Sequence, residues 1–145
     1  MSLAIACDHA GLTLKNAIVG FLVETRVPHE DLGTHSTESV DYPDYAARVG
    51  QAVAEGRARL GVLVCGTGIG MSIAANKFPR VMAALCTSPR MAVAARNHNN
   101  ANVLVLAGAQ LVLLARPERR IHQVGVALEE YLARGPFNAA WAEDR

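Results

Sequence analysis

The sequence contains few aromatic residues, few cysteines and almost no net charge. Aromatic side chains make up 5% of the 145 residues, and the formal net charge at neutral pH is +1. A nucleic-acid-binding protein would carry a basic stripe interleaved with aromatic side chains, so this class is not expected. Alanine, valine and leucine dominate instead, which favours helices packed on a sheet over a β-sandwich.

The three cysteines, Cys7, Cys65 and Cys86, are too few and too widely spaced for a disulfide framework. Because no Cys-x-x-Cys pair or histidine pair at metal-ligand spacing is present, we expect no metal site. The longest apolar stretch, VLVLAGAQLVLLA, is too short to span a bilayer, and no basic leader precedes the first apolar run. We therefore expect a soluble, cytoplasmic protein without a membrane partner.

Short apolar segments alternate along the chain with segments of helical periodicity. The apolar runs are typical of buried strands and lie at 3–7, 61–65, 81–86 and 102–107. Apolar spacing and terminal Pro or Gly residues predict helices over about 14–22, 43–55, 71–76, 89–97 and 117–134. This alternation predicts one three-layer α/β/α, Rossmann-like domain over residues 1–145, with about five parallel strands.

Ligands of such sheets bind beyond the carboxyl ends of the strands. Asp8 and His9 follow the first apolar run, and the glycine-rich segment 65–70 follows the run that ends at Cys65. We also expect the segment around His98 at this edge. These three segments are the candidate ligand-binding region.

The glycine-rich segment belongs to the stretch GVLVCGTGIGMS at residues 61–72. A glycine loop between a strand and a helix can direct backbone N–H groups at an anion, with the helix dipole behind them. The loop is not a Walker motif, because no Gly-Lys-Ser/Thr follows, and its third glycine comes one residue too early for a dinucleotide fingerprint. Met71 stands where a cysteine phosphatase would need an arginine.

A thiol at the mouth of this loop lies near a helix N-terminus, where it can lose its proton and act as a base or nucleophile. From the residue and its spacing alone, the more common interpretation of Cys65 is a small buried residue at a strand end. Cys7 and Cys86, inside apolar runs, are interpreted as core residues. His9 and His98 have polar, loop-like neighbours that suit a pocket residue as well as a surface histidine.

Five motifs together resemble the ribose-5-phosphate isomerase B family, which also includes galactose-6-phosphate isomerase. They run in order over about residues 3–108: ACDHAG at 6–11, LGT at 32–34, DYPDYA at 41–46, VCGTGIGMSIAANK at 64–77 and RNHNNANVL at 96–104. The resemblance implies an aldose–ketose isomerase that uses no metal or cofactor and works through an enediolate. Its implied substrate is ribose 5-phosphate or a related sugar phosphate.

The resemblance also implies roles for the motif residues. Cys65 would be the base that takes the proton beside the carbonyl group, Thr67 would orient its thiolate, and His98 would open the sugar ring. The loop and helix start would form an anion hole for the developing charge. The residues of this hole would be Gly66, Gly68, Ile69, Gly70 and Ser72.

Further contacts to the substrate are implied for four residues. Asp8 and Tyr42 would contact hydroxyl groups near the reacting carbons, Asn99 would bind the substrate, and His9 would lie on the phosphate side. In the family the site lies between two subunits, with the segment 98–99 reaching across. A homodimer or a dimer of dimers with shared active sites is therefore implied, and we expect residues 117–145 to take part in subunit packing.

The chain departs from the family at the phosphate end of the substrate. Gln110 replaces an arginine of a Gly-x-Arg segment, and the tail reads RGPFNAAWAEDR in place of a Gly-Gly-Arg-His segment. Glutamine cannot pair with a phosphate as arginine does. Arg90, Arg116 or Arg134 could substitute, although each is equally well interpreted as a solvated helix residue.

Several functions therefore remain open from the sequence. An isomerase of a sugar phosphate is favoured by the family, and an isomerase of an unphosphorylated sugar or a uronate-derived ketose is the close alternative. A non-catalytic sugar-phosphate-binding protein is a third, disfavoured because a binding protein needs no base. A cysteine phosphatase or transferase is a weak fourth, and a covalent intermediate on Cys65 would be its signature.

Overall fold

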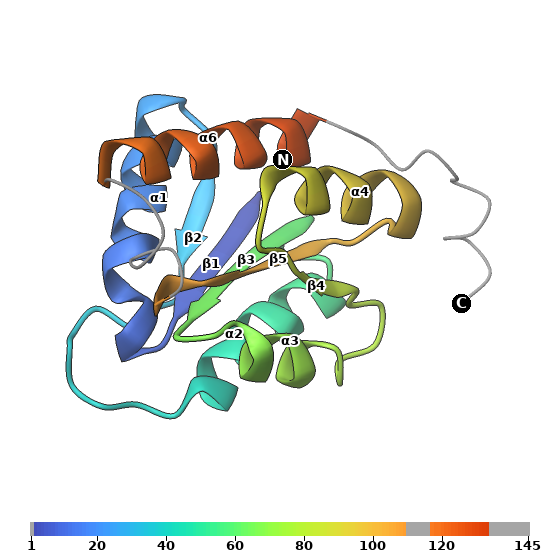
Figure 1. Ribbon diagram of the computed structural model, residues 1–145. Coiled ribbons are helices and arrows are strands. Elements are labelled where there is room, and N and C mark those ends of the chain that lie inside the picture. Colours follow the sequence, from blue (N-terminus) through green and yellow to red (C-terminus); the bar gives the residue numbers. More distant parts are fainter. Residues whose placement is uncertain (1, 110–116, 134–145) are drawn as a thin grey trace.

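The computed structural model describes residues 2–109 and 117–133, whose elements form one sheet with helices on both sides (Figure 1). The parallel strands lie in the order β2-β1-β3-β5-β4. Their bounds are β1 Leu3–Cys7, β2 His29–Asp31, β3 Leu60–Cys65, β4 Ala83–Leu85 and β5 Val103–Ala107. The helices are η1 His9–Gly11, α1 Leu12–Glu24, α2 Tyr42–Ala54, α3 Ile69–Ala75, α4 Pro89–Asn99 and α6 Pro117–Ala133.

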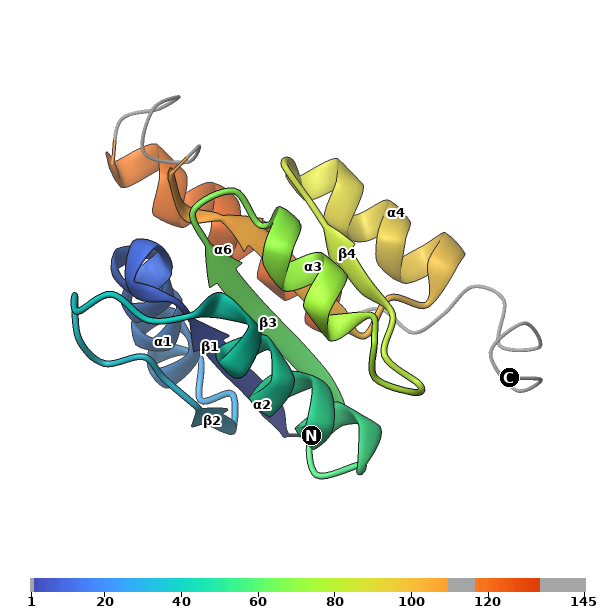
Figure 2. The ribbon, with the colours of Figure 1, turned by 90° about the horizontal axis from the view of Figure 1, so that it is seen from below.

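Two layers of helices enclose the sheet (Figure 2). Helices α1, α4 and α6 pack on one face, where their buried apolar residues form a core with Ile5, Val62 and Leu104. Helices α2 and α3 cover the other face, packing against Ala6 and Leu63. Strands β1, β3 and β5 are buried along their whole length, as central parallel strands require. The predicted α/β/α fold with five parallel strands is confirmed.

Local sequence signals set the ends of the helices. Ser88 caps α4 by accepting a hydrogen bond from the Met91 N–H at 3.3 Å, and Pro89 occupies the first helical turn. Asn100 ends the same helix in the left-handed region, with φ 51°. Pro89, which was used to predict the start of this helix, therefore lies where helix capping favours it.

Three elements differ from the sequence-based expectation. Strand β2 was not predicted, because HED is a short polar strand at the edge of the sheet. Strand β4 was predicted to be buried, whereas it is a half-buried edge strand of three residues. Helix α3 begins at Ile69, two residues earlier than predicted, so that its first turn belongs to the glycine loop.

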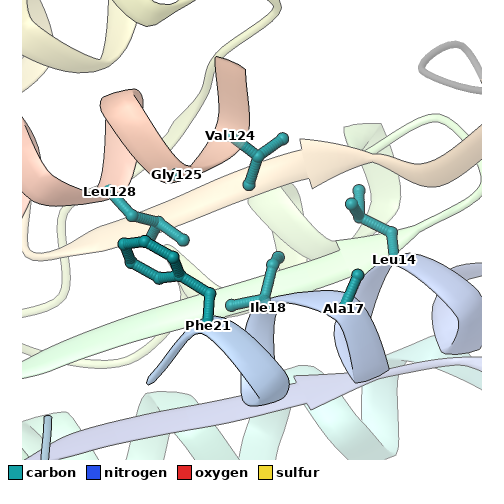
Figure 3. A pocket seen from close by; sticks show the side chains of 7 residues that line it. All are labelled: Leu14, Ala17, Ile18, Phe21, Val124, Gly125 and Leu128. Atoms are coloured by element: carbon teal, nitrogen blue, oxygen red, sulfur yellow. The ribbon is translucent and has the colours of Figure 1, made fainter. Parts of the chain in front are cut away.

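A small apolar cleft lies between helices α1 and α6 (Figure 3). Its lining includes Ile18 and Phe21 from α1 and Val124 and Leu128 from α6. None of the candidate site residues lines it. We therefore treat it as an imperfection in helix packing rather than as a ligand site.

Candidate active site

The loop between β3 and α3 places a thiol beside a helix N-terminus. Cys65 is the last residue of β3, and its Sγ accepts a hydrogen bond from the Gly68 N–H at 3.1 Å. Gly68 has φ +77°, a conformation that side chains disfavour, and an added Cβ would lie 2.3 Å from the Leu85 Cδ1. The glycine therefore turns the chain so that its N–H group faces the sulfur.

Among the described residues, no N–H group donates to the sulfur of either of the other two cysteines. Cys7 Sγ lies 3.8 Å from the Thr34 carbonyl oxygen, and Cys86 Sγ lies 3.6 Å from the Ala84 carbonyl oxygen, so both thiols donate. Burial raises the pKa of the Cys7 thiol and of the Cys86 thiol to about 11 each. Their interpretation as core residues is confirmed. Within the part of the chain that the structure describes, Cys65 alone of the three accepts an N–H group at its sulfur.

Asp8 lies beside the cysteine at the end of the neighbouring strand. Cys7 pairs with Val64, so the next residues along the two chains, Asp8 and Cys65, lie level at the end of the sheet. Asp8 is 7% exposed, and its Oδ1 accepts a hydrogen bond from the Gly11 N–H at 3.0 Å. Among the described residues no group bonds its Oδ2, which leaves one buried carboxylate oxygen for a ligand.

Tyr42 reaches the same region from the start of α2. Its ring lies against Gly70, where an added Cβ would come within 2.6 Å of the ring atoms Cε2 and Cζ. A side chain at position 70 would therefore displace the ring. Tyr42 remains 40% exposed, so part of it is accessible to a ligand.

His9 lies on η1 with its ring exposed at the edge of the site. The Val40 N–H donates to His9 Nδ1 at 3.2 Å. Because a backbone N–H can only donate, the neutral ring carries its proton on Nε2. His9 can therefore offer an Nε2–H group to a ligand oxygen.

The remaining loop residues differ in part from their expected roles. The Thr67 hydroxyl oxygen accepts the Ile69 N–H at 3.3 Å, and among the described contacts it makes no hydrogen bond to Cys65. Gly66 lies beside the loop after β1, and its carbonyl oxygen accepts the N–H of Ala109 at 3.0 Å. Ser72 lies in the second turn of α3 rather than at its start.

First-turn N–H groups of a helix have no partner within the helix, and those of α3 include Gly70. The Gly68 and Ile69 N–H groups are already engaged by the sulfur and by the Thr67 hydroxyl. An incoming anion would therefore meet the unengaged N–H groups of this first turn, with the helix dipole behind them.

His98 and Asn99 lie at the opposite end of the sheet. They are exposed in the last turn of α4, which precedes β5, whereas Cys65 pairs with the last residue of β5. Four strand residues, about 13 Å, separate the two ends. The expectation that the segment around His98 lies at the carboxyl edge is wrong, because α4 runs back to the amino end before β5 starts.

Two asparagines of the motifs serve the scaffold, which sequence reasoning missed. Asn76 bonds both the N–H and the carbonyl of Ala83 at 2.9 and 2.8 Å, as a neighbouring strand would, on the outer edge of β4. Asn102 accepts the Met82 N–H and donates to the Arg80 carbonyl, both at 2.8 Å. Amides suit this role because they carry one donor and one acceptor side by side.

The phosphate end of the site is only partly described. Gln110, Arg116 and the tail 134–145, which includes Arg134, lie outside the described residues. Arg90 is exposed in the first turn of α4. Within the described ranges, no cluster of three or more potential metal-ligating side chains occurs, and no helix is long and apolar enough to cross a membrane.

Comparison with known proteins identifies the family of the chain. A model of the Ribose/Galactose Isomerase family matches residues 3–123. The chain belongs to this family. It is similar to ribose-5-phosphate isomerase B of Escherichia coli (strain K12), with 49% identity over 110 residues that cover 76% of this chain and 73% of that protein. The resemblance found in the sequence is confirmed, and the protein is an isomerase.

Solved structures of the ribose/galactose isomerase family have the same fold. A ribose 5-phosphate isomerase from Thermotoga maritima superposes with a TM-score of 0.86 at 44% identity, covering 98% of this chain and 92% of that one. Ribose-5-phosphate isomerase B from Mycoplasma genitalium with bound ribulose-5-phosphate gives a TM-score of 0.84 at 35% identity, with coverages of 96% and 88%.

Proposed function

We propose that this protein interconverts an aldose phosphate and a ketose phosphate, with ribose 5-phosphate and ribulose 5-phosphate as the substrate pair. The observation that carries the proposal is the Cys65 sulfur, which accepts the Gly68 N–H at the end of β3, one strand away from Asp8 at the end of β1. The Mycoplasma genitalium relative with bound ribulose-5-phosphate supports this choice of substrate.

The geometry supports proton transfer between two adjacent carbons. The Cys65 thiolate takes the C2 proton of the open aldose, and the electron pair moves onto O1 to give an enediolate. The open N–H groups at the start of α3, including that of Gly70, stabilise this oxygen. A proton then passes from O2 to O1, and the Cys65 thiol returns its proton to C1, which completes the ketose.

The surrounding side chains orient the sugar for this exchange. Asp8 Oδ2, which has no partner among the described residues, accepts a hydroxyl hydrogen of the substrate, and the Tyr42 ring covers the reacting carbons. The Thr67 hydroxyl accepts the Ile69 N–H, so its own hydrogen is available to the thiolate or to O1. The His9 Nε2–H group bonds the far end of the substrate.

Opening of the sugar ring requires a second copy of the chain. By resemblance to the family, His98 would open the ring and Asn99 would bind the substrate. The length of the sheet separates both residues from Cys65 of the same chain. In a dimer, the end of α4 of each copy can reach the site of the other copy. This arrangement brings His98 and Asn99 of one copy to Cys65 of its partner. We further propose that residues 117–145 contribute to subunit packing, and that the protein acts in the cytoplasm, where its three free thiols stay reduced.

Proton NMR in deuterated water tests the proposed activity directly. Ribose 5-phosphate should exchange its C2 proton and form ribulose 5-phosphate, while free ribose, allose and uronates react far more slowly. Turnover of only the unphosphorylated sugars would instead favour the second candidate, which Gln110 in place of the family's arginine supports. Absence of exchange in every sugar would leave only a binding function.

A further inference from the structure

The turn that follows α4 is held by two buried polar side chains outside the Cys65 site. The Ala101 carbonyl oxygen accepts the Tyr131 hydroxyl at 2.9 Å and the Arg96 guanidinium at 3.1 Å. Tyr131 comes from α6 and is 0% exposed, and Arg96 is 4% exposed. A buried hydroxyl or guanidinium is costly without hydrogen bonds, so these contacts determine where the turn can lie.

The same guanidinium also fixes the residue that ends the helix. Arg96 donates to Asn100 Oδ1 at 2.7 Å. Asn100 adopts φ 51°, and its N–H and that of Ala101 both return to the Ala95 carbonyl oxygen. The chain direction immediately after the last turn of α4 is therefore set by side chains as well as by the backbone.

Burial keeps the Tyr131 hydroxyl in its donor form. It raises the pKa of this hydroxyl, so the group stays protonated throughout the physiological range and continues to donate to Ala101. The bond joins α6 to the end of α4, two elements separated by the whole of β5 in the sequence.

We infer that Tyr131 is a positioning residue for His98 and Asn99. These two exposed side chains leave the helix three and two residues before the Ala101 carbonyl, where helix ends otherwise fray. The hydrogen bond from Tyr131 to the Ala101 carbonyl holds the last turn of α4 in place. It thereby fixes the direction in which His98 and Asn99 project. The inference rests on the proposed function, in which the pair acts in the site of a second copy.

The variant Tyr131→Phe removes only the hydroxyl and keeps the buried ring. The Ala101 carbonyl retains its bond from Arg96, so no buried acceptor is left unsatisfied and the fold should persist. For ribose 5-phosphate, whose ring must open, kcat should fall about tenfold, because a small displacement of a reacting group is costly. A four-carbon aldose 4-phosphate cannot close a furanose ring, and its turnover should fall much less.

A double-mutant cycle separates positioning from general loosening of the fold. In a His98→Ala background, Tyr131→Phe should cause no further loss of turnover with ribose 5-phosphate, because the group that it positions is gone. Val124→Ala, in the same helix, is the matched control. It also removes buried atoms from α6. It should lower the melting temperature without changing the ratio of the turnover rates of ribose 5-phosphate and the four-carbon aldose phosphate.

Two results would overturn the inference while leaving the proposed function intact. One is full turnover of ribose 5-phosphate by Tyr131→Phe when His98→Ala has lost most, but not all, of its turnover. The other is an equal Tyr131→Phe loss in the presence and absence of His98. Wild-type turnover by His98→Ala would instead remove the proposed role of His98 together with this inference.

Discussion

The carboxyl and amino ends of the sheet both carry polar side chains that the family motifs single out, but the two ends are built differently. At the carboxyl end, backbone N–H groups form most of the site. The Gly68 N–H donates to the Cys65 sulfur, and the first turn of α3 presents further N–H groups. At the amino end, buried side chains from distant segments, Arg96 and Tyr131, hold an exposed helix end.

The difference reflects what each end must supply. A base and a developing oxyanion need several N–H groups at fixed positions, and closely spaced glycines allow the backbone to approach that closely. The exposed residues His98 and Asn99 need only a fixed direction. The hydrogen bonds to the Ala101 carbonyl, just after the last turn of α4, provide it. Because about 13 Å of strand separates the ends, the proposed function needs residues from two copies of the chain in one site.

The largest effect is expected from removing the base. Cys65→Ala should reduce turnover of ribose 5-phosphate by about 10²–10⁴-fold, the usual contribution of a general base. The fold should persist, because alanine is small and Cys65 is 4% exposed. C2 proton exchange in deuterated water measures the loss, and thermal unfolding followed by circular dichroism provides the control. Substantial exchange by this variant would move the base elsewhere.

Mixing two variants, each impaired at one end of the sheet, tests whether the two ends meet in one site. Cys65→Ala and His98→Ala, unfolded together and refolded, should regain about a quarter of the wild-type activity. Half of the randomly formed dimers are hybrids, and each hybrid has one intact site of two. Each variant refolded alone serves as the control. A site confined to one chain predicts no recovery from the mixture.

Gly70→Ala should disturb the carboxyl end without touching the base. The new methyl group would lie 2.6 Å from the Tyr42 ring and push it off the loop, which should lower kcat/KM about tenfold, mainly through KM. Gly20→Ala in α1 is the matched control, since nothing lies within 4 Å of the added methyl group. It should raise the stability by about 1 kcal/mol and leave the kinetics unchanged. Unaltered kinetics in Gly70→Ala would remove Tyr42 from the substrate contacts.

Much of the carboxyl end could be predicted from the sequence, because its information is local. Apolar runs ending at Cys7 and Cys65, followed by short polar or glycine-rich segments, are enough to predict strands, loops and the fold. The partner of the Thr67 hydroxyl and the Val40 bond to His9 depend on loop conformation, which no residue pattern specifies.

The amino end was misplaced although a signal existed. The RNHNNAN segment precedes an apolar run, whereas residues at the carboxyl edge of a parallel sheet follow one. Its link to Tyr131 spans 30 residues and is invisible to local patterns. Strand β2 was missed for a different reason, since a three-residue polar edge strand has no apolar signal.

The smallest predicted effect concerns Cys86, a buried thiol that lies at the same carboxyl end of the sheet as Cys65. Burial raises the pKa of Cys86 from 9.0 to about 11, so the folded protein holds this proton more tightly than the unfolded chain. The resulting stabilisation is complete below pH 9 and is lost as the pH rises toward 11. Urea unfolding between pH 8.5 and 10.5 should therefore show a free energy of unfolding that falls with pH, and Cys86→Ala should reduce this slope by the equivalent of about one proton at most. An unchanged slope would mean that Cys86 ionises as freely in the folded protein as in the unfolded chain, and the contrast between a core thiol and Cys65 would then rest on the Gly68 hydrogen bond alone.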